Sequence, residues 1–344
     1  MAASALRKNR PPTVDHTRIP TAEDKINHLF IVGAGFSHYA GLPLTTEFTT
    51  ELLDLSRVKR YGPSSGMVNL LQKFVLDAFG HSDDWQDNNW PELEDIFTCI
   101  DLSANSGHHL GPNYSPSDLR TIRRGLIVRI IRMLRQTYNR GRENAQRWET
   151  LETFFSLLAS DRCGFLSMNW DTVIEGQLRH RLKIPSFCYG CDAIPASFQG
   201  EEVVILDAPT GKQVQVLKPH GSANWLYCDA CRRVFWFPPI QTEKIAQQLF
   251  RSSDWDVVKK ITRSKKFNGK ATSRRCPLCK AEALGTRFAT FSYRKALDFP
   301  MHESSWRSAE RLLQEARTWI FIGYSLADFV EQVTSLVPAT RKGS

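Results

Sequence analysis

The chain has 344 residues, of which 42% are hydrophobic, and its formal net charge is +9. A chain of this length and apolar content can bury a sizeable core, either as one large domain with an insertion or as two domains. No uninterrupted apolar stretch approaches the roughly 18 residues that a membrane span needs, and charges and prolines stand where a signal peptide would be apolar. We therefore expect a cytoplasmic globular protein that does not contact a membrane. The charge favours an anionic partner, either nucleic acid, a dinucleotide or an acidic protein surface.

Residues 1–25 are rich in proline and basic side chains and lack apolar periodicity, which predicts a mobile basic tail. The apolar run 29–32 ends at Gly33, the pattern of a buried parallel strand that enters a tight turn. Over 62–158 the apolar positions recur mostly at helical spacing, which predicts a helical insertion. Further strand patterns occur at 164–168, 203–206, 214–217 and 319–322. Strands separated by helices predict an α/β fold with a doubly wound, Rossmann-like parallel sheet.

The first chemical motif is Gly33-Ala34-Gly35-Phe36-Ser37, directly after the first predicted strand. Glycines allow the backbone to approach a pyrophosphate, and the amides at a following helix N-terminus complement its charge. The third glycine of the usual dinucleotide fingerprint is missing, because position 38 is His38. A plain strand-to-helix turn therefore remains an alternative interpretation.

Two further motifs follow predicted strands. Asn169 and Asp171 come after 164–168, where an amide and a carboxylate can contact a sugar or a water. A capping role for Asp171 at the helix that begins near Thr172 is the alternative. His220, in Lys218-Pro219-His220-Gly221-Ser222, follows 214–217. Histidine as a residue type can act as a general base near neutral pH.

The fourth motif, Gly323-Tyr324-Ser325-Leu326, follows the last predicted strand. Parallel strands end at the same edge of a sheet, and ligands of open α/β sheets bind at that edge. We therefore expect all four loops to meet at one binding site.

The order and spacing of these motifs resemble those of sirtuins, and most closely the sirtuin-like NAD hydrolases that act as effectors in prokaryotic anti-phage defence. The resemblance extends over about 28–328 and implies a sirtuin-type NAD-binding domain over 26–344. The motifs that carry it are Gly33-Ala34-Gly35-Phe36-Ser37, Ala40-Gly41-Leu42-Pro43, Asn169-Trp170-Asp171-Thr172, His220-Gly221-Ser222 and Gly323-Tyr324-Ser325-Leu326.

The resemblance implies a role for each matching residue. NAD phosphates and ribose would be held by Gly33, Ala34, Gly35, Phe36 and Ser37. Asn169 and Asp171 would line the nicotinamide ribose pocket, with Asn169 holding the attacking water and His220 acting as the base. Gly323 and Ser325 would contact the adenosine side. Met168 stands where deacylating sirtuins carry glutamine, which argues against deacylation.

The function that we expect is an NAD glycohydrolase, which cleaves the nicotinamide–ribose bond to give nicotinamide and ADP-ribose. As a defence effector it would deplete NAD and be regulated by homo-oligomerisation or by a partner protein. Two alternatives remain open: an NAD-dependent protein deacylase, and a zinc-ribbon protein that binds nucleic acid.

Six of the eight cysteines form three C-x-x-C pairs in a long chain, which favours metal binding over disulfides. Cys228, Cys231, Cys276 and Cys279 make the better tetrahedral thiolate set and predict a structural zinc in a module over about 226–282. The remaining pair, Cys188 and Cys191, is the competing choice.

The stretch from Lys259 to Lys280 holds nine Lys or Arg residues and no Asp or Glu. We expect either a solvated insertion or a docking surface for nucleic acid or an acidic partner. Phe267 is its only aromatic residue, so base stacking is not indicated.

Overall fold

The fold is taken from a computed structural model that describes residues 26–58, 63–80, 90–158, 162–183, 187–200, 202–207, 213–265, 275–286 and 300–324. The predicted basic tail, Ser325 and the middle of the basic stretch lie outside the described residues. Within the described ranges, no helix combines the length and the apolar character needed to cross a membrane.

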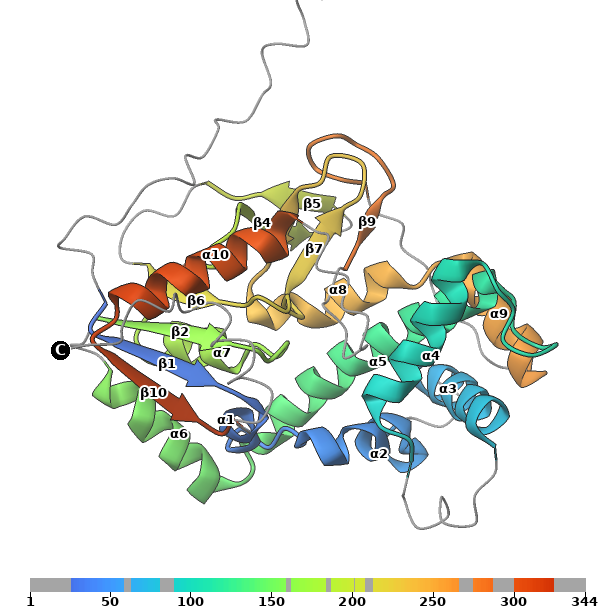
Figure 1. The fold of residues 1–344 in the computed structure, drawn as a ribbon, viewed down its shortest axis with the longest axis horizontal. Coiled ribbons are helices and arrows are strands. Elements are labelled where there is room, and N and C mark those ends of the chain that lie inside the picture. The colour runs from blue at the N-terminus through green and yellow to red at the C-terminus, as the bar shows by residue number, and fades with distance from the viewer. Residues whose placement is uncertain are drawn as a thin grey trace, which may run out of the picture.

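The main sheet has five parallel strands in the order β10-β1-β2-β6-β3 (Figure 1). In β1 (His28–Val32) each residue pairs with one residue of β2 (Cys163–Ser167) and one of β10 (Thr318–Ile322). On the far side of β2 lie β6 (Val214–Leu217) and β3 (Phe187–Cys188). The predicted α/β class with a parallel sheet is confirmed, and its neighbouring strands end level with one another.

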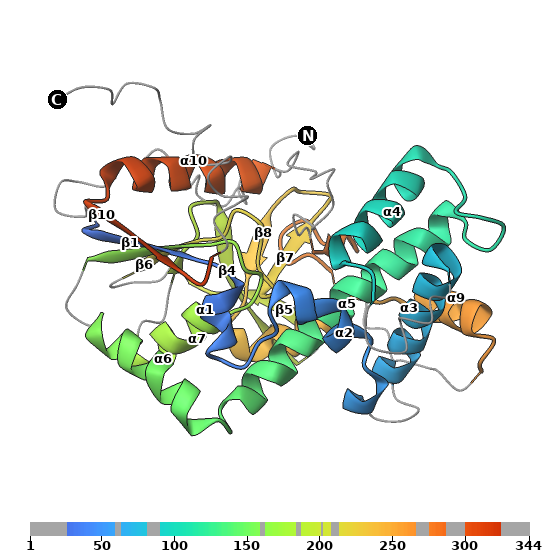
Figure 2. The same cartoon turned by 60° about the horizontal axis from the view of Figure 1, so that its bottom comes forward.

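Helices cover both faces of this sheet, as Figure 2 shows. On one face, Leu29 and Ile31 of β1 share a core with Leu312 and Leu313 of α10 (Pro300–Glu315). On the other, Phe30 packs edge-on against Phe154 of α6 (Ala145–Leu157), with ring centroids 5.3 Å apart, and α7 (Val173–Arg181) lies beside α6. Alternate residues of a strand point to opposite faces of the sheet. Because helices cover both faces here, a central strand has apolar residues on both faces, which gives an uninterrupted apolar run.

The predicted strand 203–206 does not join the main sheet. It forms β5 (Glu202–Ile205), which pairs antiparallel with β4 (Ala193–Gln199) at the edge of a second, curled sheet. That sheet has the order β5-β4-β8-β7-β9 and also contains β7 (Trp225–Cys228), β8 (Val234–Trp236) and β9 (Leu284–Gly285). Val203 is buried whereas Ile205, which points to the same face two residues later, is 37% exposed, so burial decreases toward the end of this edge strand.

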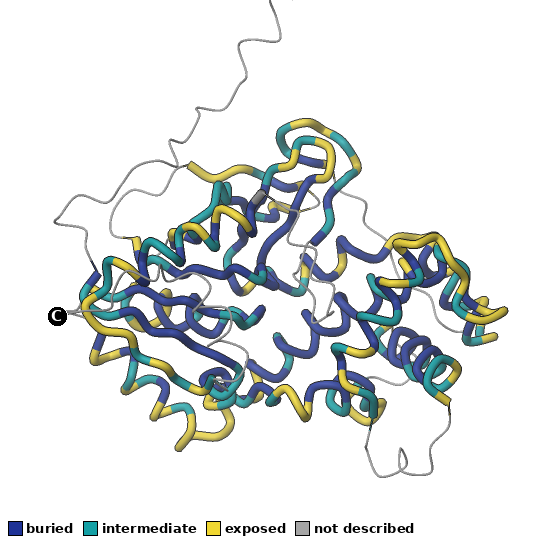
Figure 3. The backbone as a smooth tube through the Cα atoms, in the orientation of Figure 1, coloured by how far each residue is buried: buried dark blue, intermediate teal, exposed yellow. Residues whose placement is uncertain are grey.

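The predicted helical region 62–158 contains α3 (Pro63–Phe79), α4 (Leu93–Ser106), α5 (Pro116–Gly141) and α6. The longest of these, α5, begins with a capping box in which Ser115 accepts a bond from the backbone N–H of Asp118. Most of its residues are buried (Figure 3), because α3, α4 and α8 pack around it. The short helices α1 (Ala34–His38) and α2 (Phe48–Leu53) link β1 to this lobe.

The described part of the segment between the two cysteine pairs carries two helices. It contains α8 (Thr242–Leu249) and α9 (Ser252–Thr262), which leave the second sheet and pack against α5 and α3. Trp255 is buried there, and Asp254 accepts a bond from Thr121 at 3.1 Å. Part of the basic stretch takes part in this docking, because Lys260 pairs with Asp118 of α5 at 2.9 Å.

Candidate functional site at the carboxyl edge of the parallel sheet

The four sequence motifs lie at one edge of the main sheet. Gly33 directly follows β1, Met168 follows β2, Lys218 follows β6 and Gly323 follows β10. Because these strands are adjacent and parallel, the structure brings the loops together from positions almost 300 residues apart in the chain. In open α/β sheets this edge is where ligands bind.

The glycine loop after β1 packs against the loop after β10, backbone to backbone. The Gly33 and Gly35 amides donate to the carbonyl oxygens of Ile322 and Gly323 at 3.1 and 2.9 Å. A Cβ placed on Gly33 would lie only 2.6 Å from the Gly323 oxygen, and one on Gly35 only 2.7 Å from the Gly323 Cα. The close packing of these two loops therefore explains both glycines without reference to a ligand.

The side chain of Phe36 faces the core rather than the edge. It is 3% exposed and packs edge-on against Phe154 and Phe155 of α6. The Phe36 ring is therefore part of the core, and the backbone amide of Phe36 donates to the Gly33 carbonyl at 3.1 Å.

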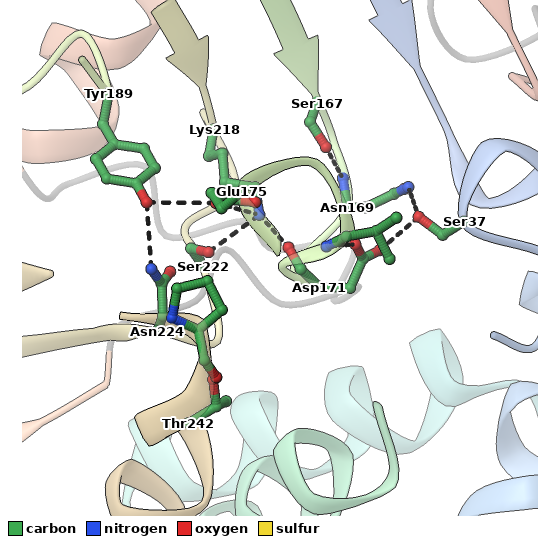
Figure 4. Close-up of polar contacts among 12 residues, drawn as sticks. Ser37, Ser167, Asn169, Asp171, Glu175, Tyr189, Lys218, Ser222, Asn224 and Thr242 are labelled. Atoms are coloured by element: carbon green, nitrogen blue, oxygen red, sulfur yellow. Dashed lines mark hydrogen bonds and ion pairs between the residues drawn. The ribbon is translucent and has the colours of Figure 1, made fainter. Parts of the chain in front are cut away.

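Ser37, Asn169 and Asp171 form one hydrogen-bonded group (Figure 4). The Ser37 hydroxyl donates to Asp171 Oδ2 at 2.7 Å. Asn169 Nδ2 donates to Ser37 Oγ at 2.9 Å and to the Gly33 carbonyl at 2.7 Å. The second carboxylate oxygen of Asp171 accepts from the Val173 amide at 2.9 Å, at the start of α7. The predicted capping role of Asp171 is thus combined with a position at the sheet edge.

His220 lies in a tight turn that is anchored at both ends. The Gly221 amide donates to the Lys218 carbonyl at 2.9 Å, and Gly221 has a φ of +86°. The Ala223 amide donates to the Trp170 carbonyl at 2.7 Å, which joins this turn to the loop that carries Asn169. The imidazole is half-buried, and its ring centroid is 6.0 Å from that of Trp306 in α10.

Sequence reasoning missed a buried polar group behind these loops. The ammonium group of Lys218 lies 3.2 Å from Glu175 Oε1 and donates to the Asp171 carbonyl. The Tyr189 hydroxyl donates to Glu175 Oε1 at 3.4 Å. Burial raises the pKa of Glu175 above its usual value, because Lys218 offsets only part of the desolvation. A lysine directly after a buried strand and a glutamate on the first turn of the helix after β2 were the available signals.

The four predicted metal-ligating cysteines come together at one end of the second sheet. Cys228 and Cys231 flank the turn between β7 and β8, and Cys276 and Cys279 lie in the turn before β9. All four Sγ atoms lie within 4.8 Å of one another, with Cys228 to Cys279 at 3.6 Å and Cys231 to Cys276 at 3.7 Å.

These distances fit a tetrahedral metal site. Four thiolates at about 2.3 Å from a zinc ion would lie about 3.8 Å from one another. Burial raises the pKa of Cys231 and Cys276, so binding of a metal would release protons from these thiols. The cluster could hold a structural metal such as zinc. Cys188 and Cys191 do not belong to it.

A scan against protein-family models gives no match for this chain, and a search of the curated proteins finds no similar sequence. The sheet edge presents an amide, a carboxylate, a hydroxyl and an imidazole on connected loops, a set that can bind a sugar and move a proton.

Proposed function

We propose that the protein is an NAD glycohydrolase with a sirtuin-type site at the carboxyl edge of the main sheet. The observation that carries the proposal is the hydrogen-bonded group of Ser37, Asn169 and Asp171, tied through Trp170 and Ala223 to the turn of His220. Loops that are distant in sequence thereby form one connected site, at the edge where a dinucleotide would bind.

Cleavage of the nicotinamide–ribose bond needs few catalytic groups, which agrees with the small number of polar side chains at the site. The nicotinamide ring of NAD is cationic and leaves as a neutral molecule, so no general acid is needed at the leaving group, unlike in ordinary glycoside hydrolysis. A positioned water and a base are sufficient for attack at the ribose carbon.

Asn169 is suited to holding that water. Because its Nδ2 donates to Gly33 and Ser37, the orientation of the amide is set, and Oδ1 is the atom that would accept a hydrogen bond from the water. His220 would take the proton, either from the water or from a ribose hydroxyl, since its half-buried ring remains accessible. Asp171 would then hold the ribose together with Ser37.

We further propose that Cys228, Cys231, Cys276 and Cys279 bind zinc. Four thiolates leave no open coordination position, so the ion would stabilise the second sheet and take no part in the reaction. NAD depletion in anti-phage defence, with control by oligomerisation or by a partner, is the physiological role that the sequence resemblance suggests.

The test is to incubate purified protein with NAD alone and to measure nicotinamide and ADP-ribose by chromatography. A glycohydrolase releases both in equal amounts. Release that requires an acylated peptide would replace this proposal with a deacylase, and NAD left intact with and without peptide would contradict both enzymes. His220→Ala, with an unchanged Tm, is the control for contaminating activity.

A further inference from the structure

The pair formed by Lys218 and Glu175 is the most deeply buried ion pair found in the described part of the chain. Its side chains are 1% and 0% exposed. The pair lies behind the site (Figure 4). Lys218 directly follows β6, and Glu175 belongs to α7. Neither residue takes part in the reaction proposed for the site.

The contacts of Lys218 connect two of the loops that form the site. Its ammonium group donates to the backbone carbonyl of Asp171 and, at 3.0 Å, to the hydroxyl of Ser222. Lys218 and Ser222 flank His220 on either side in the sequence. One buried cation thus holds both ends of the His220 turn and the main chain of the Asp171 loop.

The position of Glu175 is in turn set by the second sheet. Tyr189 donates to its carboxylate, and Asn224 Nδ2 donates to the Tyr189 hydroxyl at 3.2 Å and to the Phe237 carbonyl at 2.8 Å. The Tyr189 hydroxyl and the Lys218 ammonium group therefore contact the same carboxylate oxygen, Glu175 Oε1, and the Tyr189 hydroxyl is itself held by Asn224. These contacts run from the end of β3 to the end of β8.

Stability alone does not account for a buried pair of this kind. Replacing a buried ion pair by apolar side chains of similar volume is often neutral or stabilising, because desolvation of two charges offsets their attraction. A directional cation with three donors can, however, fix the relative position of the groups that accept from it.

We propose that Lys218 and Glu175 are positioning residues that fix the His220 turn against the Asp171 loop. The expected loss of kcat rests on the proposed function, whereas the expected movement of the His220 turn does not depend on that function. Ser222 and Tyr189 act in the same group, as acceptor for the ammonium and donor to the carboxylate.

The test uses the full chain and a double variant, Lys218→Met with Glu175→Leu. Removing both charges leaves no unpaired buried charge, so the fold should persist. The lost bonds to Asp171 and Ser222 are the positioning contacts themselves. A matched double variant, Arg124→Met with Asp254→Leu, removes an ion pair between α5 and α9 that is remote from the motif loops.

Two readouts are compared at equal occupancy of the folded state. The first is kcat and KM for nicotinamide release from NAD. The second is the ¹H–¹⁵N spectrum of the histidine imidazoles, with the His220 signal assigned through His220→Gln. The site variant should lower kcat by roughly 10- to 100-fold, the effect of misplacing a reacting group by about 1 Å, with little change in KM. Its His220 signal should shift, and the matched variant should change neither quantity.

An unmoved His220 signal in the folded site variant overturns the positioning role. If the wild-type protein leaves NAD intact, the proposed function fails, and the histidine spectrum still decides the positioning role by itself. If the double variant does not fold, Ser222→Ala removes a single contact of the ammonium and is judged by the same shift of the His220 signal.

Discussion

Two features of the structure require a glycine at position 323. Gly323 follows β10 with a φ of +62°, and a Cβ there would lie 2.1 Å from the backbone nitrogen of Phe36. Gly323→Ala should therefore destabilise the protein in two separate ways. The left-handed backbone disfavours a side chain, and the new methyl group meets the main chain of the glycine loop.

The two contributions can be separated with a second glycine. A left-handed conformation costs an alanine about 1 to 2 kcal/mol. Overpacking against a backbone that cannot rotate away adds about 1 to 3 kcal/mol, which gives about 2 to 5 kcal/mol for Gly323→Ala. Gly107 ends α4 with a φ of +73°, and a Cβ added there would meet no heavy atom within 4 Å, so Gly107→Ala should cost only the first contribution.

The assay is urea unfolding of the wild type and both variants, followed by circular dichroism. Gly323→Ala should lose about 1 to 3 kcal/mol more than Gly107→Ala, the overpacking contribution alone. Equal losses would refute the reasoning, because they would mean that the loops after β1 and β10 can separate at no cost.

Three other measurements bear on the site and on the fold around it. Cys276→Ser should abolish bound metal and lower the Tm, whereas Cys188→Ser should leave about one metal ion per chain, and elemental analysis showing metal in both or neither would contradict the assignment. His220→Ala should lower kcat for nicotinamide release by about 100- to 10,000-fold with a similar KM. Turnover at the wild-type rate would mean that another residue is the base. Burial favours protonation of Asp118, but bonds from Lys260 and Ser115 outweigh it and hold its pKa below the usual value. The pair of Asp118 and Lys260 therefore stabilises the fold at pH values above the pKa that Asp118 has in the unfolded chain. This stabilisation is lost as the pH falls through the pKa that Asp118 has in the folded protein. Lys260→Met should cost about 0.5 to 1 kcal/mol at pH 7 and progressively less as the pH falls through the folded-state pKa of Asp118. A loss independent of pH would exclude the ion pair as its cause.

The parallel sheet was predictable because its strands are apolar on both faces. A strand such as 29–32 is buried from two sides, so its sequence has no polar alternation and ends at a glycine. The position of each motif at a strand end then followed from the geometry of parallel sheets. The cysteine set was also predictable, because metal ligation imposes a C-x-x-C spacing that can be recognised in the sequence without knowledge of the fold.

The second sheet was not predictable from the same signals. The run at 203–206 is as apolar as a central strand, and only tertiary context shows that it pairs antiparallel at an edge. The two-residue strands β3 and β9 are too short to produce a pattern. The role of Glu175 was not predictable, because a buried charge is recognised by its partner and the partner is 43 positions away in the sequence.

The cysteine cluster closes a large loop in the chain. Between Cys231 and Cys276 the backbone first forms β8 of the second sheet, then forms α8 and α9 against the helical lobe, and returns toward β9. An ion bound by both cysteine pairs would hold the two ends of this loop together. It would thereby offset the entropic cost of closing the loop, which grows only slowly with loop length. The lobe would then gain rigidity from a ligand that it does not touch, and amide hydrogens of α9 should exchange faster when the metal is removed.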